Sequence, residues 1–347
     1  MTQSKLRPVH HLFQLVQRRS FTLSSRRFKA TASEAANHLL ETFADKSVIR
    51  RQFIDGNQLQ KLALTLGQTS IDGADVTEVP PVAGTPVPQG YHLVYFTPNG
   101  TEQELGDDGT DRTFNASAPF TRRMWAGGKM EWPAPSTGAL LRVGDEVEER
   151  TRLVSATAKK SRSAGEMVLV QVEKEFWGPN GLALSDQRSW VFRPEIDLES
   201  PPPAPRRLED VAPGPSSIKD VAENGDGLTR ELRWSPVGLF RFSALTFNGH
   251  MIHYNDPWTR DMEGHPGLVV HGPLNLINLL DYWKDAYGKG QGPRSISYRA
   301  MSPLYAGQTY HIKTAGVKET EGGKVWDVLV ERDGVVCMKS EIASHDS

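Results

Sequence analysis

Apolar residues recur at helical spacing in two parts of the chain. Residues 34–66 carry apolar side chains three and four positions apart, which predicts short helical pieces. A longer helix is predicted to open at Gly272-Pro273 and to run as far as Trp283, because proline suits the first helical turn. Apolar residues fall on most sides of this second helix, so we expect it to be deeply buried.

Short β-rich runs make up most of the remaining periodic segments. Residues 167–172 and 189–192 are two such runs, and a Gly-Pro-Asn-Gly sequence between them predicts a turn. Residues 324–331, followed by an Asp-Gly hairpin signal, predict the same arrangement near the end of the chain. An apolar run at 91–96, within a segment rich in proline and glycine, is a further strand candidate.

The second half of the chain repeats the pattern of the first. Residues 304–310 (LYAGQTY) echo residues 141–147 (LRVGDEV), and each leads into a strand, a polar turn and a β-run. Such a long repeat suggests two copies of one small α+β domain, with an antiparallel sheet around a long helix that is clear only in the second copy. A proline-rich stretch, which cannot build a core, separates them. The predicted leader, first domain, linker and second domain are residues 1–33, 34–197, 198–230 and 231–347.

The composition is that of an ordinary folded protein, with 38% hydrophobic and 24% charged residues. It excludes collagen-like and wholly disordered chains, and the single cysteine, Cys337, excludes a disulfide framework or a Cys-rich zinc site. No window of roughly 18 apolar residues predicts a membrane span. With 40 Lys and Arg residues against 42 Asp and Glu, the charge gives no indication of nucleic-acid binding.

The even overall charge conceals a basic leader. Seven basic residues, but no acidic ones, precede Glu34. Residues 9–16 carry an apolar stripe at helical spacing, and the Arg-Arg-Phe sequence at 26–28 resembles a matrix-processing site. An amphipathic, acid-free segment rich in Arg and Ser predicts a mitochondrial transit peptide over residues 1–33 and a matrix location; a disordered basic tail is the alternative. Without the leader, 33 Lys and Arg residues stand against 42 Asp and Glu, so the mature body is acidic.

Four of the ten histidines fall within residues 250–271, close to Asn248 and the predicted helix start. One interpretation is a metal site, since His250 and His253 would share a helical face with acidic residues nearby. Helical zinc pairs of this kind are usually four residues apart with Glu between, however, and Gly249 weakens the helix. A second interpretation is structural, with each imidazole satisfied by backbone bonds. We predict neither a metal nor a cofactor.

A third interpretation is acid–base catalysis beside an oxyanion site. His253 can take up and return a proton near neutral pH. Asn248 can hold a water molecule, although it cannot change its charge. Backbone N–H groups near Gly272 can receive a developing negative oxygen, and glycine has no side chain to block the approach. These parts suit the addition of water to a carbon–carbon double bond conjugated with a thioester carbonyl.

This stretch resembles the MaoC-like hydratases and dehydratases of the hotdog fold, which have one motif around the catalytic residues and a second at the start of the central helix. The matching residues are Leu245, Thr246, Ile252 and His253 in the first motif and Val270, His271 and Gly272 in the second. The departures are Phe247 for Gly, Asn248 for the catalytic Asp, His250 for Asn and Met251 for Pro.

A narrower resemblance covers nearly all of the chain after the leader. It is to the two-hotdog branch of that family, which contains itaconyl-CoA and mesaconyl-CoA hydratases and mitochondrial type 2 3-hydroxyacyl-thioester dehydratases. The segments that carry it are residues 80–81, 91–93, 122–128, 240–248, 252–254 and 266–274. Asn in place of Asp is usual in this branch. The resemblance implies a double-hotdog hydro-lyase with a degenerate first copy, and a second copy that carries catalytic His253 and Asn248 and the oxyanion-binding Gly272.

Other residues are candidates for binding the substrate. Arg123 and Arg260 can pair with a substrate carboxylate or a coenzyme A phosphate. Trp125 can line an acyl pocket, and His271 is a candidate through its place in the second motif. For each Arg and Trp, a structural role is the alternative.

The predicted substrate is a short dicarboxylyl-CoA, with itaconyl-CoA or mesaconyl-CoA hydrated to citramalyl-CoA. One alternative is a 3-hydroxyacyl chain on mitochondrial acyl carrier protein, but such carriers are strongly acidic and the mature body is acidic as well. A second alternative is a hotdog protein that binds acyl thioesters without turnover. The expected partners are the acyl-CoA, acyl carrier protein as its alternative, and a second copy of the chain in a homodimer.

Overall fold

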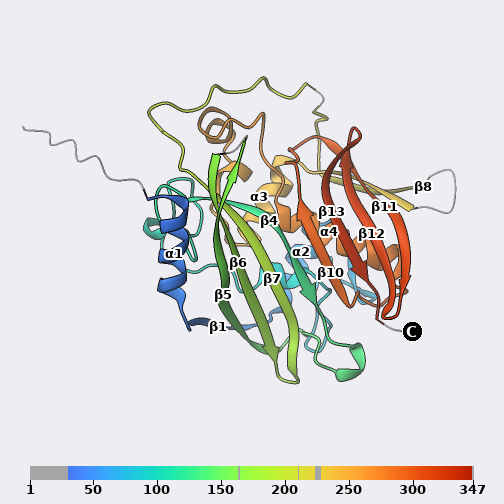
Figure 1. The fold of residues 1–347 in the computed structure, drawn as a ribbon. Coiled ribbons are helices and arrows are strands. Elements are labelled where there is room, and N and C mark those ends of the chain that lie inside the picture. Colours follow the sequence, from blue (N-terminus) through green and yellow to red (C-terminus); the bar gives the residue numbers. More distant parts are fainter. Residues whose placement is uncertain (1–29, 163–164, 210, 223–227, 346–347) are drawn as a thin grey trace, which may run out of the picture.

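The computed structural model describes residues 30–162, 165–209, 211–222 and 228–345 (Figure 1). The predicted transit peptide lies outside these residues, apart from positions 30–33. None of the described helices is long and apolar enough to cross a membrane.

The helices and strands fall into two sets along the chain. Those of the first half are α1 (Ala32–Phe43), β1 (Ser47–Phe53), α2 (Gly56–Thr65), β2 (Ser70–Ile71), β3 (Ala74–Asp75), the 3₁₀ helices η1 (Tyr91–Val94), η2 (Glu102–Glu104) and η3 (Pro135–Thr137), and the strands β4 (Arg122–Glu131), β5 (Glu146–Ser161), β6 (Gly165–Gly178) and β7 (Gly181–Arg193). Those of the second half are β8 (Ser217–Ala222), β9 (Leu228–Arg233), α3 (Pro236–Leu245), the 3₁₀ helix η4 (Met251–His253), the π-helical η5 (Trp258–Met262), α4 (Gly272–Tyr287), and the strands β10 (Ser295–Ala300), β11 (Thr309–Thr320), β12 (Gly323–Arg332) and β13 (Val335–Ala343).

One sheet of eleven strands, antiparallel throughout, runs through the molecule in the order β1-β5-β6-β7-β4-β10-β13-β12-β11-β9-β8. Outward from the junction of β4 and β10, the first half follows β4-β7-β6-β5-β1 and the second follows β10-β13-β12-β11-β9, so the two topologies match. This arrangement confirms the predicted α+β double hotdog. The junction depends on close backbone approach, because a Cβ atom at Gly127 of β4 would lie 2.4 Å from the Tyr298 carbonyl oxygen of β10.

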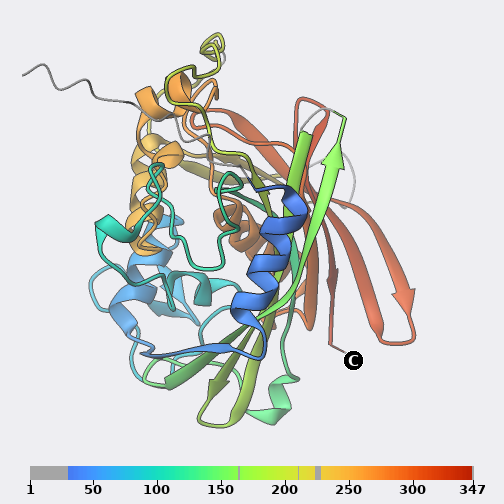
Figure 2. The same ribbon diagram turned by 60° about the vertical axis from the view of Figure 1, so that its left-hand side comes forward.

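In the second half, α4 lies within the curve of the sheet (Figure 2). Its side chains are buried on most sides, as the apolar pattern predicted, and Leu276, Ile277 and Leu280 share one core with Tyr310 and Val328 of the strands. Full burial of such a leucine or isoleucine side chain stabilises the fold by roughly 1.5–3 kcal/mol. The start of α4 is therefore held firmly in place.

The first half has no counterpart of α4 among the described residues. Between α2 and β4, where the topology would place it, the chain forms η1, η2 and long loops. A different helix, α1, precedes β1 and lies against β5 and β6 (Figure 2). Its Ala35 and Leu39 pack with Val170, Phe192 and Phe120 in a second, smaller core.

The strand expected at 91–96 is wrong, because this segment forms the 3₁₀ helix η1. Gly90 takes a left-handed φ of 91°, and the N–H of Leu93 donates to its carbonyl. The side chains of Tyr91, Leu93 and Val94 are all buried, so the apolar run reflects burial on several sides of a tight turn and not a half-buried strand.

The second domain also begins earlier than predicted. Strand β8 pairs with β9 over Ser217–Ala222 and Leu228–Arg233, within residues assigned to the linker. The proline-rich stretch itself stops at Pro215, and the N–H of Ser235 donates to Ser216 Oγ at 3.0 Å. The second half of the sheet therefore begins near Ser217 and not at residue 231.

Candidate active site

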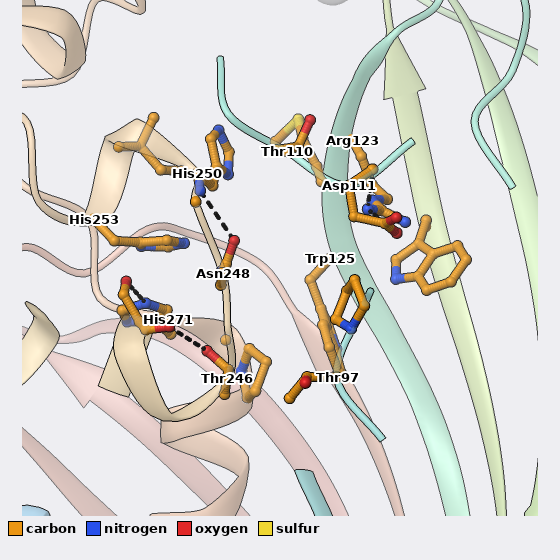
Figure 3. Close-up of a pocket in the computed structure, with 18 of the residues that line it drawn as sticks. Thr97, Thr110, Asp111, Arg123, Trp125, Thr246, Asn248, His250, His253 and His271 are labelled. Carbon is orange, nitrogen blue, oxygen red and sulfur yellow. Dashed lines mark hydrogen bonds and ion pairs between the residues drawn. The ribbon is translucent and has the colours of Figure 1, made fainter. Parts of the chain in front are cut away.

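A cavity of about 1050 Å³ is lined by residues from both halves of the chain. Asn248, His253 and His271 lie on one side of it, and Arg123 and Asp111 lie on the other (Figure 3). The cavity therefore meets the histidine-rich loop of the second half and the inner face of the first-half sheet.

The loop at residues 246–257 is termed the catalytic loop, because it carries the candidate residues Asn248 and His253. It begins where α3 ends. Ser235 caps the start of α3, and at its end the N–H of Asn248 donates to the Ser243 carbonyl at 2.9 Å. This bond closes a turn in which Phe247 takes a left-handed φ of 48°, a conformation that favours glycine at such helix ends. Glycine is the residue that the MaoC-like motif carries at this position, so the motif records a backbone requirement.

A loop of the first half packs directly on the catalytic loop. The N–H of Met251 donates to the Asp108 carbonyl at 2.9 Å. A Cβ atom at Gly109 would lie 2.1 Å from the Gly249 carbonyl oxygen, and one at Gly249 would lie 2.7 Å from the Gly109 carbonyl oxygen. Gly249 is therefore needed for close approach between the halves, which the sequence did not indicate.

His253 is buried at the end of η4 with one ring nitrogen held by the backbone. Its Nδ1 lies 2.8 Å from the Val269 carbonyl oxygen, which can only accept, so Nδ1 carries the proton. Burial, and then the charge of His250, lower its pKa to about 3 against the favourable backbone bond. The side chain is thus neutral at physiological pH and its Nε2 is available as a proton acceptor.

His271 supports His253 from below. The two rings stack with centroids 3.6 Å apart and planes 17° apart. His271 Nε2 lies 2.9 Å from Ser243 Oγ, and burial lowers the pKa of His271 far below its ordinary value. These contacts hold the ring of His253 in place, and His271 also lines the cavity. Ser243 was not singled out from the sequence.

Asn248 and Gly272 complete this wall. Asn248 Oδ1 accepts the His250 N–H at 3.1 Å, which leaves the amide NH₂ without a protein partner among the described residues. Gly272 is the first residue of α4, and its N–H likewise has no partner within the described part of the chain. Gly272 faces Trp125, because a Cβ atom added at Gly272 would lie 3.5 Å from Trp125 Cγ. The predicted oxyanion donor is therefore present at the cavity.

Two of the other predicted substrate-binding residues line the cavity and a third does not. Trp125 and Arg123 line the cavity, but the guanidinium of Arg123 is 3.1 Å from Asp111 Oδ2 and also donates to Thr113 O at 3.2 Å. Arg260 is not among the residues that line the cavity, and its Nη2 donates to Pro205 O at 3.4 Å. Arg260 therefore contacts the proline-rich linker and not the cavity.

A buried group of charges on the inner face of the first-half sheet was not predicted. Lys174 pairs with Glu149, and Arg188 Nη2 lies 2.6 Å from Asp186 Oδ2. Burial would raise the pKa of Asp186, but the charges and hydrogen bonds of Arg188 and His92 together outweigh it and lower the value to about 2. Burial lowers the pKa of Lys174 to about 8. Lys174, Glu149 and Arg188 line the cavity, so its first-half wall is charged.

A second charged group surrounds His250. Asp108, His250 and Glu263 each offer one potential ligand atom, and the three atoms lie within 4.8 Å of one another. Glu263 already accepts from Trp258 Nε1 at 3.1 Å and from Arg122 Nη2 at 3.2 Å. A guanidinium at that distance opposes a divalent cation, so this donor set fits a metal poorly.

Comparisons with known proteins identify relatives of this chain. The family model for hydroxyacyl-thioester dehydratase type 2 matches residues 90–306. A mesaconyl-C(4)-CoA hydratase from Chloroflexus aurantiacus is 33% identical over 227 residues, which cover 65% of this chain and 73% of that protein. The mitochondrial hydroxyacyl-thioester dehydratase type 2 of Schizosaccharomyces pombe is 24% identical over 304 residues, which cover 80% of this chain and 92% of that protein.

Solved structures share the fold. A MaoC-like dehydratase superposes with a TM-score of 0.62 at 13% identity, covering 89% of this chain and 100% of its own. HtdX of Mycobacterium tuberculosis superposes with a TM-score of 0.52 at 15% identity, covering 86% of this chain and 100% of its own.

Proposed function

The chain belongs to the hydroxyacyl-thioester dehydratase type 2 family, and we propose that it is a hydro-lyase that adds water to the double bond of a short dicarboxylyl-CoA. The substrates proposed are itaconyl-CoA and mesaconyl-CoA, each hydrated to citramalyl-CoA. The observation that carries the proposal is one cavity that holds a neutral imidazole and a helix N-terminus on one wall and buried cations on the other.

The chemistry follows from the second-half wall. His253 Nε2 takes a proton from a water molecule that the Asn248 amide orients, and the water oxygen bonds to the β-carbon. In mesaconyl-C4-CoA, whose double bond is conjugated with the thioester, the electron pair of the double bond moves toward the thioester oxygen, where the Gly272 N–H and the start of α4 stabilise the negative charge. The α-carbon then receives a proton, which in the simplest scheme is the one held by His253. Dehydration is the reverse, and acid–base help of this kind contributes roughly 100- to 10,000-fold.

The first-half wall supports a charged acyl group over a fatty chain. Arg188 uses Nε and Nη2 for Asp186, so other N–H groups of its fork are left to bind a second carboxylate. An aliphatic chain against Arg188, Lys174 and Glu149 would instead bury charges without new partners, which costs free energy.

The separation of the two walls also suits a short acyl group. Trp125 lies between the two walls. One edge of the Trp125 indole faces Gly272, and the guanidinium of Arg188 lies 5.3 Å from the centroid of the indole ring. A four-carbon dicarboxylyl group has roughly 4 Å between its end carbons, given carbon–carbon bonds of about 1.5 Å. Its thioester oxygen can then reach the Gly272 N–H while its carboxylate reaches toward Arg188.

Hydration assays on the purified chain test this proposal. The panel consists of mesaconyl-C4-CoA, itaconyl-CoA and, as the matched control, 3-methylcrotonyl-CoA, in which a methyl group replaces the carboxylate. We expect citramalyl-CoA from at least one dicarboxylyl-CoA, with kcat/KM at least tenfold above the control. Binding of these thioesters without turnover would contradict the proposal and support a non-catalytic acyl-thioester-binding protein.

A second candidate is dehydration of 3-hydroxyacyl groups on acyl carrier protein. The family model and the Schizosaccharomyces pombe relative, both described as type 2 hydroxyacyl-thioester dehydratases, favour it. Turnover of a 3-hydroxyhexanoyl carrier protein, without turnover of dicarboxylyl-CoA, would replace the first proposal by this one. Gel filtration with and without the carrier protein also tests whether the enzyme is a homodimer.

We also propose that the protein is imported into the mitochondrial matrix. The acid-free leader supports this location, as does the mitochondrial relative. In the structure, Thr31 caps α1 and forms a capping box with Glu34, so cleavage before Thr31 would leave the helix intact. Fluorescence of residues 1–33 fused to a reporter should coincide with a matrix marker, and a diffuse signal would contradict import.

A further inference from the structure

We propose that His250 is a second proton carrier, which delivers the proton to the α-carbon while His253 removes the proton of water. This inference rests on the proposed hydro-lyase function. Without it, His253 must serve both carbons, because Asn248 occupies the position of the motif carboxylate and cannot carry a proton.

The geometry places His250 at the reaction site. It lines the same cavity as His253, and the two rings lie edge to face with centroids 5.4 Å apart and planes 81° apart. The side-chain Oδ1 of Asn248 accepts a hydrogen bond from the backbone N–H of His250 at 3.1 Å. Asn248, which stands in place of the motif carboxylate, therefore holds the backbone of His250. The side chain of His250 is 12% exposed.

Two carboxylates flank the side chain of His250. Its Nε2 is buried, without a hydrogen bond of good geometry, at 3.5 Å from Glu263 Oε1 and 3.8 Å from Asp108 Oδ2. The other titratable groups that face it are His253, His271 and His265, all with lowered pKa values, and Arg122, which lies 3.2 Å from Glu263 Oε2.

These neighbours leave a charge for His250 to balance. Burial would raise the pKa of Glu263, but the interactions with His250, Trp258 and Arg122 outweigh it and lower the value to about 2. Two carboxylates against one guanidinium leave one negative charge among the neighbours. In the proposed cycle, a proton carried by His250 would balance this charge.

The proposed step is balanced in atoms and charge. The proton of water moves to His253 Nε2 as oxygen bonds to the β-carbon, and the double-bond electrons move toward the thioester oxygen. The enolate then takes a proton from the His250 imidazolium at the α-carbon and the thioester carbonyl re-forms. His253 is left protonated and His250 neutral, and exchange with solvent water restores the starting state.

This scheme has a characteristic pH dependence. Hydration needs His250 protonated and His253 neutral, and dehydration needs the reverse, so both directions require one proton on the pair. The kcat/KM values of hydration and of dehydration should therefore both fall at alkaline pH, as the pair loses this proton. We call this fall the alkaline limb. A single-carrier mechanism needs no proton on the pair at the start, so it shows no such limb.

The test is the pH profile of kcat/KM for mesaconyl-C4-CoA hydration, measured for the unmodified chain and for His250→Asn. We expect the alkaline limb only in the unmodified chain and a fall of roughly 100-fold or more in the variant's plateau rate, the lower end for general acid catalysis. His265→Asn is the matched control, because His265 also lies at the cavity but its Nδ1 faces Tyr305 Oη at 3.3 Å. It should keep both the limb and most of the rate.

Asp108→Asn gives a second readout if His250→Asn fails to fold. It retains an oxygen to accept the Thr110 N–H, which Asp108 Oδ1 accepts at 2.9 Å, but removes one negative charge beside His250. The alkaline limb should then move to lower pH by a measurable amount, a shift that a purely structural role would not produce.

Several outcomes would overturn the inference. If the alkaline fall in kcat/KM persists in His250→Asn, it must come from the titration of another group. Lys174 is the first candidate, because its pKa is about 8. A stoichiometric divalent metal that is present in the unmodified chain and lost in His250→Asn would assign the cluster to a metal instead. Absence of turnover by the unmodified chain would overturn the proposed function and this inference with it, whereas turnover that is unchanged in His250→Asn would overturn the inference alone.

Discussion

The two halves share one strand topology but differ in what lies inside the curve of the sheet. The second half holds the buried helix α4, whose first residue, Gly272, faces the cavity. The described part of the first half has no such helix, and charged Lys174 and Arg188 line the space that its sheet encloses. A helix that fills the sheet stabilises the fold and presents an N–H group, whereas its loss leaves room for a ligand.

The difference shows how one fold divides two tasks. In the second half, the buried helix holds His271, and His271 in turn holds the ring of His253. In the first half, the inward positions of β6 and β7 no longer need to pack a helix, so they can carry Lys174 and Arg188. We therefore propose that the filled half carries out catalysis and that the open half recognises the acyl group.

The largest expected effect comes from His253. His253→Ala should lower kcat by roughly 100- to 10,000-fold, because it removes the proton acceptor, while the circular dichroism spectrum stays unchanged. His38→Ala is the control, since His38 is an exposed histidine on α1 of the first half. Full activity in His253→Ala would contradict the assignment of the chemistry to the second half.

The neighbouring Asn248 refines this result. Asn248→Ala should also lower kcat severely, and Asn248→Asp should retain part of the rate because it can still hold water. An inactive Asn248→Asp would show that the amide donor itself is required.

The contact between the halves can be broken at Gly109. Gly109→Ala should lower kcat about tenfold or more, because its Cβ atom would meet the Gly249 carbonyl oxygen and displace the catalytic loop. Gly138→Ala is a matched control: Gly138 has a left-handed φ of 67° but no atom within 4 Å of an added Cβ. Equal activity in the two variants would show that the first-half loop does not position the site.

Acid should destabilise the catalytic half in a specific pH range. The pKa of His253 is lowered from 6.5 to about 3, so between these values the unfolded chain binds a proton that the folded chain does not. The free energy of unfolding, measured with urea, should therefore fall as pH decreases from about 6.5, by up to about 1.4 kcal/mol per pH unit for this group. His253→Asn should reduce that slope, and an unchanged slope would contradict burial of a neutral His253.

The smallest effect concerns the left-handed turn. Phe247→Gly should raise the free energy of unfolding by at most about 1 kcal/mol, because glycine tolerates the φ of 48° but adds freedom to the unfolded chain. Phe240→Gly is the control, since exposed Phe240 lies inside α3 and glycine there should destabilise by about 1 kcal/mol. Thermal melts that move in the same direction for both variants would contradict the strain at Phe247.

Periodicity predicted the central helix and the long strands better than the tight turns. The apolar pattern of α4 and the alternating runs of β6, β7 and β12 depend on burial against one partner, which a local window records. Tyr91 to Val94 are buried on several sides by distant residues, so their apolar run carries no information on the turn that they form. The position of Arg260 depends in the same way on a contact with the linker.

The candidate site was predictable where residues of suitable chemistry fall within a short family motif. His253 and Gly272 were found in this way, and the structure brings both to the cavity. The charged wall had a readable signal that was missed: in β7, Asp186 and Arg188 fall on the same alternate positions as buried Leu184 and Trp190. Charged residues on the inward face of a strand indicate a polar cavity, because such groups are rarely buried without partners. The grouping of His250 with Asp108 and Glu263 was not predictable, since it joins loops far apart in the sequence.

The central claim, that the first half recognises a charged acyl group for a catalytic second half, is tested most directly by a selectivity measurement. The quantity is the ratio of kcat/KM for mesaconyl-C4-CoA to that for 3-methylcrotonyl-CoA, compared between Asp186→Asn and the double variant Asp186→Asn/Arg188→Met. The single variant controls for loss of the partner carboxylate. We predict that the ratio falls roughly 10- to 100-fold in the double variant alone, as expected for a lost hydrogen bond to a charged group. A ratio that is equal in the two variants, or a preference of the unmodified chain for 3-methylcrotonyl-CoA, would contradict the claim.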